Sequence, residues 1–255
     1  MTIEADLTVY HDPYAKDPSA ELAALILRRD ELRFHVAEEL RIEYMMKVGA
    51  KELAVWRKSI EYRKMRRKLS KYRAYMNRGE QPDEDRIEEE LAKEFEDYEE
   101  RIRERTEEMK ELLHRMDCEM LTPDETKELR DMYTKVVKRL HPDLNQGADQ
   151  KDIDMYCAAV DAYKNGNLDK MRAIYWTVVD DREVIIPETD IKARILEVKA
   201  EIDMILKSFP FDEREFLKDE EAVAERNREL DEMMGEYEEQ IVLIRNSAAR
   251  MGVMM

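Results

Sequence analysis

The residues best suited to a specific chemical role form the tripeptide His141-Pro142-Asp143, which directly follows a helical pattern. Proline disfavours helical geometry at the residue before it, so the helix is expected to end at His141 and to present its imidazole. The carboxylate of Asp143 accepts local hydrogen bonds and holds the turn. The tripeptide is therefore predicted to form a turn that Asp143 holds and that presents the imidazole of His141. The alternative is an ordinary loop histidine with one hydrogen bond.

The helix before the tripeptide is predicted to have one apolar face and one basic face. Lys135 and Lys138 fall opposite the apolar positions, and Arg139 adds a third cation close to the tripeptide. Three exposed cations suit an acidic groove on a partner protein, although a merely solvated face is the alternative. The positions predicted to be buried are Leu129, Tyr133, Val136, Val137 and Leu140.

Helix signals place the tripeptide between two helices. Thr122 and Glu125 have the spacing of a capping box at the start of the first helix. The second helix is predicted to begin at about Lys151. Its small residues Ala159 and Ala162 allow the two helices to approach closely.

The stretch 129–145, LRDMYTKVVKRLHPDLN, resembles the second helix and loop of a J-domain, the module of DnaJ-like co-chaperones. The next helix matches the family's pattern of aromatic residue, spacer, alanine and tyrosine at Tyr156, Ala159, Ala162 and Tyr163. The resemblance covers roughly a fifth of the chain. It implies an antiparallel hairpin that docks on a DnaK-type chaperone and stimulates its ATPase. The docking residues that it implies are Tyr133, Lys135, Lys138, Arg139, His141, Pro142 and Asp143.

The chain departs from the family pattern in three places. The family's first helix has no match, and residues 109–120, at the end of a long acidic helix, are expected to substitute for it. Leu144 stands where a cation often follows the tripeptide, which weakens the expected docking. Neither a Gly/Phe-rich linker nor repeated cysteine modules follow. The resemblance is therefore to the minimal class of J-domain proteins, whose other segments specialise them.

Composition favours long helices and disfavours several function classes. Charged residues make up 41% of the chain, which has only six glycines and seven prolines. The net charge of −17 disfavours nucleic-acid binding by the whole molecule. Two cysteines without metal-ligand spacing indicate a cytoplasmic protein, and neither a signal peptide nor a membrane span is expected. The sequence contains no phosphate loop, nucleophile elbow or zinc signature. It therefore gives no reason to expect an enzyme, a bound metal or a cofactor.

Residues 19–111 are predicted to form a long antiparallel hairpin around a turn at 77–83. Residues 28–78 contain 16 lysines and arginines and 7 acidic residues, a net charge of +9. Residues 80–111 contain 16 acidic residues and 6 lysines and arginines, a net charge of −10. The basic run 63–73 is the segment that would bind nucleic acid. The favoured interpretation is that it faces the acidic helix.

The C-terminal third has two heptad seams that predict a coiled-coil hairpin over 187–250. The first seam contains Ile191, Ile195, Val198, Ile202 and Ile205. The second contains Val223, Asn227, Leu230, Met234, Tyr237, Ile241 and Ile244, and residues 248–255 are expected to form a loose tail. Asn227 lies inside the second seam and is expected to fix the register of the coiled coil or the choice of its partner helix.

The predicted protein is all-α, with a J-domain-like hairpin flanked by two long antiparallel helical hairpins. Its domains are an N-terminal arm at 1–18, a hairpin at 19–111, a J-like domain at 112–180 and a coiled coil at 187–250. The expected function is that of a non-enzymatic co-chaperone for a DnaK-type ATPase and a client that the sequence does not specify. The coiled coils would supply location, client binding or homodimerisation. The alternative is a coiled-coil scaffold or nucleic-acid-associated adaptor with a degenerate J-domain.

Overall fold

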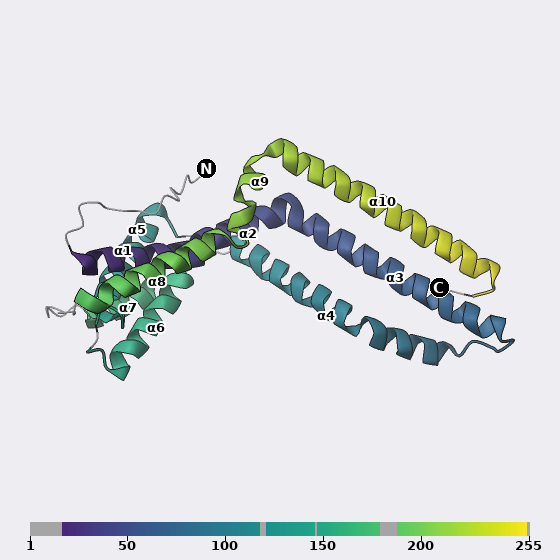
Figure 1. Ribbon diagram of the computed structural model, residues 1–255, viewed down its shortest axis with the longest axis horizontal. Coiled ribbons are helices and arrows are strands. Elements are labelled where there is room, and N and C mark those ends of the chain that lie inside the picture. Colours follow the sequence, from purple (N-terminus) through teal and green to yellow (C-terminus); the bar gives the residue numbers. More distant parts are fainter. Residues whose placement is uncertain (1–16, 118–120, 146, 179–187, 254–255) are drawn as a thin grey trace. The chain divides into compact units, whose positions relative to one another are not determined.

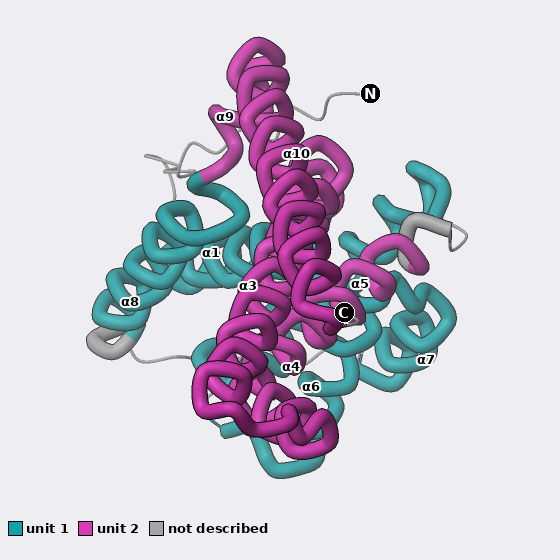
Figure 2. Tube along the Cα trace, turned by 90° about the vertical axis from the view of Figure 1, so that its right-hand side faces the viewer, with its two compact units in different colours: residues 1–40, 118–212 teal, residues 41–117, 213–255 magenta. Residues whose placement is uncertain are grey.

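The computed structural model describes residues 17–117, 121–145, 147–178 and 188–253. Every regular element in these ranges is helical, which confirms the predicted all-α fold. The chain forms two compact units (Figure 2). Unit 1 combines residues 1–40 with 118–212, and unit 2 combines 41–117 with 213–255. None of the helices in the described ranges is long and apolar enough to cross a membrane.

Unit 1 contains the tripeptide and the helices around it. In this unit α5 packs against α1, α6 and α7, and α8 packs against α1 (Figure 1). The predicted capping box is present, because Thr122 and Glu125 bond reciprocally at the start of α5. The helices are α1 (Pro18–Glu31), the π-helical turn η1 (Leu32–Val36), α5 (Pro123–Leu140), α6 (Gln150–Lys164), α7 (Leu168–Val178) and α8 (Glu188–Leu206), and α2 (Ala37–Tyr44) spans the boundary in sequence.

Two ring contacts show how α5 and α6 are oriented. Tyr133 stacks on Tyr163 with ring centroids 4.0 Å apart, and His141 meets Tyr156 edge-on at 4.9 Å. From the first contact to the second, the residue number rises from 133 to 141 on α5 and falls from 163 to 156 on α6. The two helices therefore run antiparallel. Ala159 and Ala162 are fully buried, as expected where two helices approach closely.

Unit 2 is built around α3, which lies between α4 and α10 (Figure 1). Its apolar clusters join α3 to both neighbours. One combines Ile60 and Tyr72 with Ile87, Leu91 and Phe95 of α4. Its elements are η2 (Met45–Gly49), α3 (Ala50–Asn77), α4 (Glu84–Asp117), α9 (Arg214–Lys218) and α10 (Glu220–Arg250), and the short turn η3 (Phe211–Glu213) precedes α9.

Ion pairs confirm the predicted charge pairing between α3 and α4. Lys64 lies 2.5 Å from Glu99, Arg67 lies 2.7 Å from Glu94, and Lys71 lies 2.7 Å from Glu90. In these three pairs the residue number increases along α3 while that of the partner on α4 decreases, so the two helices of this hairpin run antiparallel. The hairpin is shorter than predicted, because α1 belongs to unit 1 and only α3 and α4 form it.

The predicted coiled-coil hairpin over 187–250 is wrong, because its two seams pack against different helices. α8 belongs to unit 1 and packs against α1, whereas α10 belongs to unit 2 and packs against α3. The seams themselves are correctly placed. The first buries Ile191, Ile195, Val198 and Ile202, and the second buries Leu230, Ile241 and Ile244. The side-chain amide of Asn227 donates to the carbonyl oxygen of Lys47 at 2.9 Å, in the turn η2 that precedes α3 and not in α8.

Two further boundaries differ from the prediction. The J-like domain was expected to begin at residue 112 with residues 109–120 in place of the missing first helix. Residues up to Asp117 instead belong to α4 and unit 2, and the helix that packs against α5 is α1. The tail is not loose in its described part: α10 continues to Arg250, Ala248 is buried, and Met251 and Val253 pack against the apolar clusters of unit 2. The predicted N-terminal arm lies outside the described residues apart from Asp17 and Pro18.

Candidate functional site

The backbone turns at the tripeptide as its sequence predicts. α5 ends at Leu140, and His141 has extended dihedral angles, φ −61° and ψ 128°. Its carbonyl oxygen accepts from the backbone N–H groups of Leu144 and Asn145, each at 2.9 Å. Proline at 142 enforces the extended geometry at His141, and these two bonds close the turn. The turn therefore has a fixed shape that the tripeptide itself specifies.

The imidazole of His141 is buried rather than presented to solvent. Only 5% of the residue is exposed, and its ring packs edge-on against Tyr156. Its Nδ1 accepts from the backbone N–H of Asp143 at 3.1 Å, which requires that nitrogen to be unprotonated. Burial lowers the pKa of His141 to about 4, although the nearby Asp143 opposes the shift. The ring is therefore neutral at pH 7.

The carboxylate of Asp143 is already engaged within the chain. Arg194 of α8 donates from Nε to Asp143 Oδ2 at 2.5 Å, and its Nη1 donates to Glu197 at 2.6 Å. These two carboxylates raise the pKa of Arg194. Only Pro142 of the tripeptide is largely exposed. Both polar side chains of the tripeptide thus have partners in unit 1.

Tyr133 is fully buried and bonded to a buried carboxylate. Its hydroxyl donates to Asp30 of α1 at 2.7 Å, and Arg29 donates to the other Asp30 oxygen from Nη2 at 2.8 Å. Burial raises the pKa of Tyr133, and the negative charge of Asp30 adds to the shift. The structure therefore places this predicted docking residue in the core of unit 1, out of reach of a partner.

The predicted cations of α5 lie in different environments. Lys135 and Lys138 are exposed, whereas Arg139 is half-buried. The ammonium of Lys135 donates to the Tyr175 hydroxyl at 3.1 Å and lies 5.2 Å from the centre of that ring. Both lysines are thus exposed on α5, and the ammonium of Lys135 is already bonded to Tyr175.

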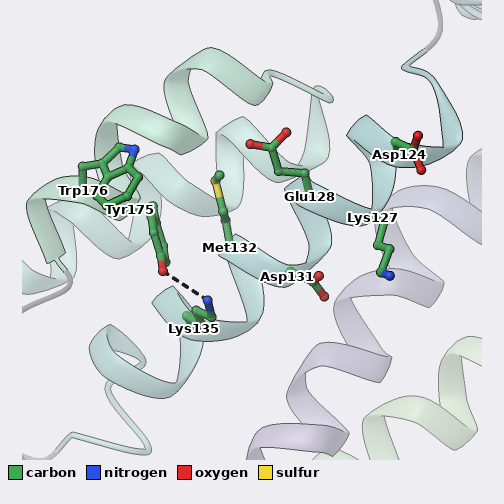
Figure 3. Close-up of a pocket in the computed structure, with 8 residues that line it drawn as sticks. All are labelled: Asp124, Lys127, Glu128, Asp131, Met132, Lys135, Tyr175 and Trp176. Carbon is green, nitrogen blue, oxygen red and sulfur yellow. Dashed lines mark hydrogen bonds between the residues drawn. The ribbon is translucent and has the colours of Figure 1, made fainter.

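A groove between α5 and α7 adjoins Lys135, and the sequence reading missed it. Figure 3 shows Lys135 pointing toward Tyr175 across this groove, which has a volume of about 410 Å³. Trp176 lies beside it with 75% of its surface exposed. The groove is lined by Asp124, Lys127, Glu128, Asp131, Met132, Lys135, Tyr175 and Trp176.

Three other residues of the site were missed by sequence reasoning, namely Arg29, Asp30 and Arg194. Asp30 had a detectable signal: it follows Leu22 and Ile26 at helical spacing on the buried stripe of α1, where a carboxylate needs a partner. Arg194 had no comparable signal on α8. Elsewhere, no three His, Cys, Asp or Glu side chains of the described ranges cluster as ligands for a metal ion.

The basic run 63–73 lies on α3 and belongs to unit 2, whereas the tripeptide and its partners belong to unit 1. Acidic residues of α4 pair with Lys64, Arg67, Lys68 and Lys71. The remaining cations of the segment, Arg63, Arg66 and Arg73, are exposed, and Arg73 donates to Ser247 of α10 at 3.0 Å. No protein-family model, curated protein or solved structure matches the chain.

Proposed function

We propose that the protein is a co-chaperone that recruits a DnaK-type chaperone and stimulates its ATPase. The observation that carries the proposal is the antiparallel pair of α5 and α6, joined by the His-Pro-Asp turn and carrying exposed Lys135 and Lys138. This is the arrangement that the J-domain resemblance of residues 129–145 implies. The cytoplasmic location belongs to the same proposal, because two cysteines cannot supply a disulfide framework.

The proposed role is one of coupling rather than catalysis. Docking accelerates hydrolysis only if it favours the hydrolysis-competent state of the chaperone over its resting state. The exposed lysines would supply electrostatic attraction to an acidic groove, which affects mainly affinity and association rate. The tripeptide would supply the contact that distinguishes the two states. Affinity and stimulation should therefore respond to different substitutions.

A second candidate is a structural protein in which the tripeptide serves only the core of unit 1. The burial of Tyr133 and His141 favours it, since both side chains are packed and bonded within the chain. A nucleic-acid adaptor is less favoured, because acidic residues of α4 pair with most of the lysines and arginines between 64 and 71.

The test is single-turnover ATP hydrolysis by a purified DnaK-type chaperone across a range of concentrations of the full chain. Lys135→Glu with Lys138→Glu should raise the concentration for half-maximal stimulation about ten-fold or more, and excess protein should restore the rate. Lys151→Glu with Lys164→Glu is the matched control, since it makes the same charge change at exposed positions of α6. Absence of stimulation at saturating protein rules out the proposal, and equal effects of the two pairs rule out the α5 face.

A further inference from the structure

The polar groups of the tripeptide are satisfied by the chain itself, which leaves little for a partner to bind. His141 Nδ1 accepts from the Asp143 N–H, and the Asp143 carboxylate accepts from Arg194 at 2.5 Å. A partner that needs either group must first replace these bonds. Since His141 is 5% exposed, a partner must also gain access to its ring.

The helix that supplies Arg194 is fixed to α1 independently of the tripeptide. Ile195, Val198 and Ile202 bury the apolar face of α8, and α8 packs against α1. Lys199 bonds to Glu21 at 2.8 Å, and Arg29 bonds to Glu201 at 3.2 Å. The α1–α8 pair is therefore a stable element that places Arg194 beside the tripeptide.

The α1–α8 pair also contacts the middle of α5, through residues of α1. Arg29 and Asp30 of α1 form an ion pair of 2.8 Å, and Asp30 accepts from Tyr133 of α5. The α1–α8 pair thus holds α5 at three points: Asp30 bonds to Tyr133 in the middle of the helix, Glu31 bonds to Arg130 at 2.6 Å, and Arg194 bonds to Asp143 beyond the end of the helix. The first contact is buried, whereas the Arg194 side chain is 33% exposed and lies at the edge of the site.

We propose that Arg194 on α8 is an autoinhibitory latch that holds the tripeptide in a masked form, so that the chain acts on its partner only after this contact opens. The inference rests on the proposed function. A protein whose competent form is a fraction of the population binds with an affinity reduced by that fraction. Opening begins when the partly exposed Arg194–Asp143 pair separates, which leaves α8 in place because its apolar contacts with α1 do not involve the tripeptide.

Arg194→Glu is the releasing variant, because it places a third carboxylate beside Asp143 and Glu197. Lys192→Glu is the matched control: it makes the same charge change at an exposed position of α8. Arg194→Gln removes the charge without reversing it and serves as a milder variant if the reversal disturbs folding. Circular dichroism establishes which variants keep the helical content of the wild type.

The first measurement does not involve a chaperone. Diethyl pyrocarbonate labelling followed by mass spectrometry reports the reaction of each histidine separately, including His141. We expect His141 to react roughly five- to thirty-fold faster in Arg194→Glu than in the wild type, with a smaller increase in Arg194→Gln. Lys192→Glu should react at the wild-type rate. Unchanged labelling of His141 in both Arg194 variants overturns the latch.

The second measurement is single-turnover ATP hydrolysis by a DnaK-type chaperone. Arg194→Glu should reach half-maximal stimulation at a roughly five- to thirty-fold lower concentration than the wild type, with the same rate at saturation. Lys192→Glu should match the wild type. If wild type and Arg194→Glu stimulate with equal potency, the latch is wrong and the proposed function stands. If His141 becomes reactive but no variant stimulates, the proposed function is wrong and the regulatory inference fails with it.

Discussion

At the scale of single residues, His141 gives the protein a specific dependence on pH. Burial lowers its pKa to about 4, from 6.5 in the unfolded chain. Between about pH 4 and pH 6.5 the imidazole of His141 is protonated in the unfolded state but not in the folded state. The free energy of unfolding therefore falls as the pH falls through this range. The loss is at most about 1.4 kcal/mol for each pH unit in this window. Urea unfolding at pH 7 and pH 5 measures it.

His141→Gln provides the control, because glutamine does not titrate. The groups that act on His141 stay in place in this variant, namely Asp143, Arg29, Asp30 and Arg194 together with the packed ring of Tyr156. The stability difference between pH 7 and pH 5 should therefore be smaller in the variant. Equal differences would show that His141 does not carry the effect. Because His141 is buried, the variant should also lose some stability at pH 7.

The hydroxyl of Tyr133 should contribute to folding rather than to docking. Tyr133→Phe keeps the stacked ring but removes the bond to the buried Asp30, so we expect a loss of about 1–2 kcal/mol in the free energy of unfolding. Tyr175→Phe removes a hydroxyl bonded to the exposed Lys135 and should change the same quantity by less than about 0.5 kcal/mol. Similar losses in the two variants, measured by urea unfolding, would contradict the assignment.

Local features of the site could be predicted from sequence, and its distant partners could not. The helix end at His141 follows from the adjacent proline, and the capping box follows from residues three positions apart. Tyr133 was placed on the buried face by its spacing, yet its partner Asp30 lies 103 positions away. Arg194 lies 51 positions from Asp143. Contacts at such separations depend on which helices pack together, and helical periodicity carries no such information.

At the scale of elements, α8 should be sensitive on one face only. Ile202 is buried, so Ile202→Asp places a carboxylate in the apolar contact of unit 1 and should cost more than about 3 kcal/mol. Met204 is two residues away and 63% exposed, so Met204→Asp should change stability by less than about 0.5 kcal/mol. Thermal unfolding followed by circular dichroism compares them. An unchanged midpoint for Ile202→Asp would contradict the packing of this face.

The two C-terminal seams show what a heptad pattern can and cannot specify. Ile195 and Leu230 were correctly predicted as buried, because spacing identifies the apolar face of a helix. The pattern does not name the helix that covers that face. Two adjacent seams favour a local hairpin, but here α1 and α3 provide the covering surfaces from the N-terminal part of the chain. For α3 and α4 the partner was predictable, since opposite charges flank a short turn.

At the scale of the whole molecule, charge pairing should keep nucleic-acid binding weak. The net charge is −17, and Lys64, Arg67 and Lys71 are paired with acids of α4. We therefore expect duplex binding weaker than micromolar at physiological salt, measured by fluorescence anisotropy. Sub-micromolar binding that weakens steeply with salt would show that the exposed Arg63 and Arg66 form a binding surface instead.

The most direct test of the proposed function asks whether the tripeptide itself acts on the chaperone. The measurement is single-turnover ATP hydrolysis at saturating full-length protein, comparing Arg194→Glu with the double variant Arg194→Glu/His141→Gln. Both proteins lack the Arg194 contact, so the comparison isolates the role of His141. We expect the single variant to stimulate hydrolysis and the double variant, although folded, not to do so. Equal stimulation by both proteins, or none by either, would contradict this expectation.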